Sequence, residues 1–176
     1  MLVGKLHPYR KTSACVTDAK GADRYAVARM AEFIRESGLT KFVYKSDQES
    51  SVKTVMTNAI KEVISEAAKK TGSTGEFAPV PENSAVGASA SNGRAERAVQ
   101  AVEDLVRTLK AALESRLDWK IPSSHPVVRW IVEHAADVMN KYAVNKSGMS
   151  PYEELHGRKA HERRVEFGKR VVVSNP

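Results

Sequence analysis

Two acidic side chains occupy positions from which a carboxylate could take part in chemistry. Asp47 follows directly on a short β-prone run, residues 41–45 (KFVYK), and Glu96 falls in the expected first turn of a long helix behind a loop. Carboxylate oxygens are hard ligands of the kind that suits Mg²⁺ or Mn²⁺. Position alone assigns neither residue a role, because most acidic residues are solvated and a Glu in a first helical turn often only balances the helix dipole.

The residues around these acids form three motifs in a fixed order. They are residues 46–49 (SDQE), 91–97 (SNGRAER) and 150–159 (SPYEELHGRK). Together they resemble the integrase catalytic core of retroviruses and LTR retrotransposons, and the third motif looks like the segment that closes the core in copia-type elements. Residues 165–168 (VEFG), followed by apolar 171–173, are similar to the family's exit into a small β module. The resemblance covers nearly the whole chain.

The resemblance implies a ribonuclease H-like fold and a polynucleotidyl transferase that processes 3′ ends and joins DNA strands. Family members use three carboxylates to hold two divalent metals, usually Mg²⁺, or Mn²⁺. One metal lowers the pKa of the attacking water or 3′-hydroxyl, and the other stabilises the leaving oxygen. By resemblance, Asp47 is the second of these carboxylates and Glu96 is the third, so both are the expected catalytic and metal-binding residues.

The resemblance also implies that the partner is DNA, bound mainly through its phosphates. Relatives often place Lys one and two turns after the catalytic Glu, but this chain has Gln100 and Glu103 there. The candidate DNA-binding residues that remain are Asn92, Arg94, Arg97, Arg107 and Lys110. For each cation, a solvated helix-face charge is an equally good interpretation.

The family's first catalytic Asp belongs to the first, central strand of the sheet, and no residue of this chain matches it. Asp18 follows the second expected strand, which is the far edge of the family's sheet. With strands about 4.8 Å apart, a carboxylate two strands away lies roughly 10 Å from the site, so Asp18 is a poor substitute. We therefore expect a core that lacks its first strand and is inactive by itself, which leaves the chain's status as an enzyme open.

Hydrophobic periodicity predicts the elements that must position these residues. Expected helices are 21–37, about 51–70, 93 to about 117, one beginning at Pro126, and a short one after Ser150. Expected strands are 2–6 and 13–17 as a hairpin, 41–45, a short edge strand 77–80 limited by Pro79 and Pro81, and 170–174. Residues 82–93 read as a loop that ends in an N-cap at Ser91 or Asn92. This order predicts an α/β fold, a mixed sheet flanked by helices.

Length and composition favour one domain with a tail. With 176 residues and 41% hydrophobic content, we expect a core domain at 1–160 and a tail at 161–176 that begins a following β module. The net charge of +7 favours a polyanionic partner. Cys15 is the only cysteine, which excludes an internal disulfide or a cysteine zinc cluster. The five histidines have no compact ligand spacing.

Other expectations concern the cellular setting. No apolar stretch approaches the ~18 residues that a bilayer span needs, so no membrane association is expected. Relatives work as multimers, which implies a homo-oligomer. The nucleus is inferred from a DNA substrate, with the cytoplasm as the alternative. Two other functions stay open: a non-catalytic DNA-binding or oligomerising remnant, and a ribonuclease H-like nuclease that cleaves without joining.

Overall fold

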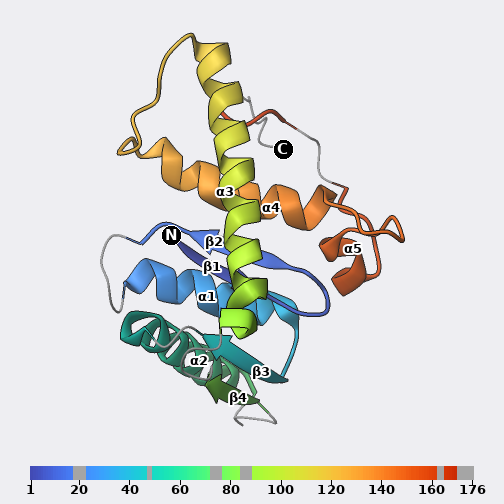
Figure 1. Cartoon of the computed structure of the whole chain (residues 1–176). Coiled ribbons are helices and arrows are strands. Elements are labelled where there is room, and N and C mark those ends of the chain that lie inside the picture. The colour runs from blue at the N-terminus through green and yellow to red at the C-terminus, as the bar shows by residue number, and fades with distance from the viewer. Residues whose placement is uncertain (18–22, 47–48, 72–76, 84–88, 162–164, 170–176) are drawn as a thin grey trace, which may run out of the picture.

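The computed structural model describes residues 1–17, 23–46, 49–71, 77–83, 89–161 and 165–169, and it has a mixed α/β architecture (Figure 1). The described elements, in chain order, are β1 (Leu2–Lys5), β2 (Thr12–Cys15), α1 (Arg24–Ser37), β3 (Lys41–Ser46), α2 (Ser50–Thr71), β4 (Ala78–Asn83), α3 (Ser89–Leu117), α4 (Val127–Tyr142) and α5 (Pro151–His156). This order matches the prediction from hydrophobic periodicity. The predicted strand 170–174 and Asp18 lie outside the described residues.

The strands form two separate two-stranded sheets. Strands β1 and β2 make the predicted antiparallel hairpin, with Leu2 opposite Cys15 and Lys5 opposite Thr12. Strands β3 and β4 are parallel, and α2 connects them. Within the described part of the chain, no strand joins the two sheets into one.

The hairpin lies between two helical layers because its side chains alternate between its faces. Leu2 and Cys15 pack into a core built mainly by α1 and α2. Val3 and Ala14 pack on the opposite face, in a core with residues of α3 and α4. The side chains of Phe42 and other residues of β3 join the first core, so both sheets share the α1–α2 layer.

Helix α1 agrees closely with its predicted range of 21–37. The Asp23 side chain accepts a hydrogen bond from the Tyr25 backbone N–H as the N-cap. At the other end Gly38 has φ of 65°, the left-handed conformation that glycine adopts without strain. The predicted stop at Gly38 is therefore confirmed.

The predicted start of the long helix is wrong. Helix α3 begins at Ser89, so part of the predicted loop 82–93 is helical, and Ser91 and Asn92 lie inside the helix rather than at its N-cap. Glu96 is consequently about two turns into α3 and not in its first turn. Residues such as Ser and Ala cost only tenths of a kcal/mol in a helix, and an established helix propagates readily into them.

Strand β4 is longer than predicted and passes through Pro79 and Pro81. The Ala78 N–H donates to the Thr40 carbonyl at 2.9 Å, which fixes which residues of β4 face β3. Because alternate residues face opposite edges, the two proline nitrogens lie on the outer edge, where no donor is needed. The prolines therefore mark an edge strand, as predicted, without limiting its length.

Cys15 is 2% exposed, and burial, followed by the nearby Glu133 carboxylate, raises its pKa to about 11. Against an ordinary value of 9.0, this shift lowers the thiolate fraction at pH 8 about a hundredfold. We expect iodoacetamide to modify the native protein at least about a hundred times more slowly than the chain in guanidinium chloride. Intact mass spectrometry over time measures this, and equal rates in the two solutions would contradict the buried position.

Candidate functional site

The structure describes only part of the expected site. Strand β3 ends at Ser46, immediately before Asp47, as the sequence predicts. Asp47 itself lies outside the described residues, as does the side chain of Asn92. The structure therefore gives no distance between the carboxylates of Asp47 and Glu96. That these two residues bind one metal together stays a prediction.

Glu96 lies on the solvent-facing side of α3. Its side chain is exposed, and so are those of Arg94, Arg97 and Gln100 around it. The opposite side of the same turns carries Ala98 at 6% exposure, followed by the fully buried Val102. The buried stripe fixes the rotation of α3, so the Glu96 carboxylate faces water and is accessible to a ligand.

The four candidate DNA-binding cations divide into two groups. Arg94 and Arg97 have no ion-pair partner among the residues that the structure describes. Arg107 contacts Asp104 at 2.6 Å and Glu103 at 3.3 Å, both within its own helix. Lys110 forms an ion pair with Glu114. A phosphate would have to compete with these carboxylates at Arg107 and Lys110, but not with a described carboxylate at Arg94 and Arg97.

The donor chemistry at Glu96 suits a hard divalent cation, because its exposed carboxylate offers oxygen ligands and has no ion pair with a described residue to break first. Among the described residues, no group of three or more His, Cys, Asp or Glu side chains converges on one point. Of the two expected metal-binding residues, Glu96 is the one that the structure describes. Asp47 would have to complete it from the end of β3.

The third sequence motif forms the caps of α5. The Ser150 hydroxyl accepts a hydrogen bond from the Glu153 N–H at 3.1 Å, and Gly157 closes the helix with φ of 67°. Arg10, in the turn after β1, reaches the same helix and contacts Glu154 at 3.3 Å. Capping and docking of α5 therefore account physically for several residues of this motif.

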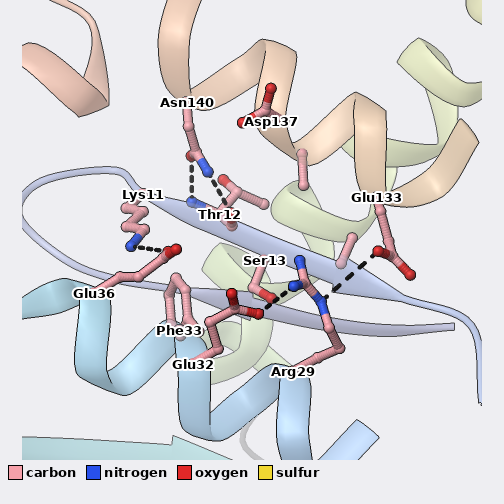
Figure 2. A pocket seen from close by; sticks show the side chains of 12 residues that line it. Lys11, Thr12, Ser13, Arg29, Glu32, Phe33, Glu36, Glu133, Asp137 and Asn140 are labelled. Atoms are coloured by element: carbon pink, nitrogen blue, oxygen red, sulfur yellow. Dashed lines mark hydrogen bonds and ion pairs between the residues drawn. The ribbon is translucent and has the colours of Figure 1, made fainter. Parts of the chain in front are cut away.

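Sequence reasoning missed a polar cleft of about 100 Å³ between α1, the outer edge of β2 and α4 (Figure 2). Arg29 contacts Glu32 and also lies 3.8 Å from Glu133, while Lys11 contacts Glu36 at 2.7 Å. Cations and carboxylates thus neutralise one another across the cleft, and their main effect is to join α1 to the hairpin and to α4. These partners are far apart in the sequence, so no local pattern identifies them.

Tyr25, His125 and His134 have structural roles. Tyr25 donates to Glu133, and burial together with this carboxylate raises the tyrosine pKa to about 12. His125 accepts a hydrogen bond at the start of α4. Rings stack between His134 and Phe167, with centroids 4.9 Å apart. Burial lowers the pKa of His134 and favours its neutral form.

No family model and no curated protein matches the chain. Within the described residues, no helix combines the length and the apolar character that crossing a membrane requires.

Proposed function

We propose that the chain is an integrase-type, ribonuclease H-like catalytic core that binds DNA and whose chemistry requires Mg²⁺ or Mn²⁺. The observation that carries the proposal is the exposed carboxylate of Glu96 on α3, with Arg94 and Arg97 next to it in the sequence. Among the described residues, neither arginine has an ion-pair partner. The sequence motifs and the mixed α/β architecture support it. A polynucleotide backbone fits this surface because it can meet the two guanidinium groups with phosphates and the carboxylate through a cation.

The proposed roles follow from side-chain chemistry. Arg94 and Arg97 would contact phosphates and orient the DNA along α3, since guanidinium groups pair with phosphate oxygens in a bidentate manner. Glu96 and Asp47 would hold the metal, which when bound supplies charge stabilisation at phosphorus. In this proposal the protein works as a homo-oligomer in the nucleus, with the cytoplasm as the alternative, and strand transfer requires a further carboxylate.

A non-catalytic remnant that oligomerises is the second candidate. The observation that favours it is Trp130, an aromatic side chain that is 71% exposed on α4. Large exposed aromatic residues are common anchors of protein interfaces. Light scattering during size-exclusion chromatography, with and without Mg²⁺ and DNA, separates the two candidates, because a remnant would oligomerise without responding to either ligand.

DNA binding is the direct test of the proposal. The double variant Arg94→Gln/Arg97→Gln is expected to weaken duplex binding about tenfold or more and to reduce the slope of log K against log salt by about 2, roughly 0.9 for each lost phosphate contact. Fluorescence anisotropy of a labelled duplex at several salt concentrations measures both quantities. Arg107→Gln is the matched control with a smaller expected effect, since Arg107 is already paired with Glu103 and Asp104. An unchanged salt slope in the double variant would exclude this surface.

A further inference from the structure

The last described segment, residues 165–169, is the red segment beside α3 in Figure 1, and we name it the clasp. Of its five residues, Phe167 alone is partly buried, and the other four are exposed. Phe167 packs against a cluster between α3 and α4 that contains Leu113, Ile121 and Ile131. A segment with so few buried contacts opens at a lower free energy than the core does.

The polar contacts of the clasp are made at the surface. The Arg116 guanidinium donates to the Phe167 carbonyl and pairs with the Glu166 carboxylate at 3.3 Å. The Lys169 N–H donates to the Glu166 carbonyl at 3.0 Å and closes a turn. Exposed ion pairs contribute little to stability, so the hold of the clasp depends mainly on what surrounds the Phe167 ring.

Gly168 allows the clasp to approach α3 closely. Its φ of 74° is in the left-handed region that glycine adopts without strain, and an added Cβ would lie 2.9 Å from Cδ1 of Leu113. A groove of about 500 Å³, lined in part by Leu109, Leu113 and Phe167, lies beside this contact. The clasp therefore fits α3 tightly at Gly168 and loosely next to it.

The ring of Phe167 lies against the imidazole of His134 on α4. The two ring centroids are 4.9 Å apart, and the ring planes are tilted by 36°. The imidazole is half-buried, and this burial lowers the pKa of His134 below its ordinary value of 6.5. A neutral imidazole is thus better accommodated under the closed clasp than a charged one.

The charged groups of the surrounding elements do not offset the effect of burial. Asp137 raises the pKa of this imidazole and Lys141 lowers it, and these two side chains pair with each other at 2.9 Å. Arg116 of α3 and Glu166 of the clasp likewise form a pair. Lys169, the other charged residue of the clasp, is exposed, and its positive charge does not stabilise a second cation.

We propose that residues 165–169 form a pH-sensitive clasp, which is closed on α3 and α4 while His134 is neutral and opens when the imidazole takes up a proton. In the open state the imidazole is in water and has its ordinary pKa of 6.5, whereas the closed state binds the proton less tightly. Acid therefore favours the open state as the pH falls below about 6.5. Opening frees the chain that follows Lys169 from α3 and α4.

Methyl NMR of Leu113 measures this opening, because Leu113 contacts the clasp. Phe167→Ala and Gly168→Ala supply the signals of an open clasp, the first by removing the buried ring and the second by a clash with α3. In the wild-type protein, we expect the open population to rise at least about twofold between pH 8 and pH 5. Protection of the Thr12 N–H, which the Asn140 amide accepts at 2.7 Å, is expected to stay unchanged and shows that the core remains folded.

His134→Phe keeps a ring beneath Phe167 but cannot take up a proton, so this variant is expected to remain closed at both pH values. His156→Phe is the matched control with the wild-type response, because His156 also stacks on an aromatic ring, that of Tyr152, but in α5. If His134→Phe does not fold, His134→Gln replaces it and is likewise expected to lose the pH response. A wild-type Leu113 signal that is the same at pH 8 and pH 5, or a wild-type response in the His134 variant, would overturn the proposal. These measurements involve neither DNA nor a metal, so their failure is separate from failure of the proposed function.

Discussion

Replacing Glu96 by glutamine is expected to weaken Mn²⁺ binding at least about tenfold, while duplex binding stays nearly unchanged. Glutamine keeps the size of the side chain and one oxygen ligand but loses the negative charge that balances a divalent cation. Because Glu96 is exposed on α3, the substitution breaks no packing contact in the core. Electron paramagnetic resonance of Mn²⁺ measures the metal affinity directly, whether or not the chain turns over DNA.

Glu103→Gln is the matched control for this prediction. Glu103 lies two turns further along α3 and has the same side chain, but it pairs with Arg107 at the surface. It is expected to leave the Mn²⁺ affinity unchanged. Equal Mn²⁺ affinity in the wild-type protein and in Glu96→Gln would remove Glu96 from the metal site, and the resemblance to integrase cores would lose its third carboxylate.

The four longer helices, α1 to α4, were predictable because each buries an apolar stripe. In α4, for example, Ile131, Val132 and Ala135 recur at helical spacing, and all three are buried. The end of a helix was predictable where only one residue type adopts the required backbone conformation without strain, as glycine does at Gly38. The start of α3 was not predictable in this way. Ser89 to Asn92 are compatible with both a loop and a helix, and their helical state depends on the long apolar-striped helix that continues from Gly93.

The polar contacts that hold the elements together could not be predicted from the sequence. The bonds between Asn140 and Thr12 join residues 128 positions apart, and an asparagine in a helix has no pattern that points to a strand edge. The division of the four strands into two separate sheets could not be predicted from the sequence either, because the pairing of strands depends on their positions in space. For the candidate site, Glu96 and its neighbouring arginines were predictable from the sequence motif, whereas the exposure of their side chains on α3 is known only from the structure.

A second site of large expected effect is Glu114, which fixes the connection between α3 and α4. Its carboxylate accepts a hydrogen bond from the Ile121 N–H at 2.9 Å, pairs with Lys110, and contacts Lys120 at 3.1 Å. Ile121 is 3% exposed and packs in a core cluster with Leu113. Hydrogen bonding from Lys110, then from the Ile121 backbone and Lys120, lowers the pKa of Glu114 to about 2.

This carboxylate links stability to pH in the acid range. Its folded pKa of about 2 lies below the ordinary value of 4.5, so the folded protein binds the proton less tightly than the unfolded chain does. The contribution of Glu114 is therefore complete above pH 4.5 and is lost as the pH falls from about 4.5 to about 2. Acid lowers the stability of the native chain in this window, in addition to the effects of its other carboxylates.

Glu114→Ala is expected to lower the melting temperature at pH 7 by about 5 °C and to flatten its decline between pH 4.5 and 2. The substitution leaves the N–H of the buried Ile121 without its acceptor and removes the group that titrates in this window. Glu103→Ala is the control, because its ion pair with Arg107 is exposed and contributes little to stability. Thermal unfolding followed by circular dichroism at several pH values measures both effects. A Glu114→Ala protein with the melting temperature and acid dependence of wild type would show that the α3–α4 connection is held by the apolar contacts of Ile121 alone.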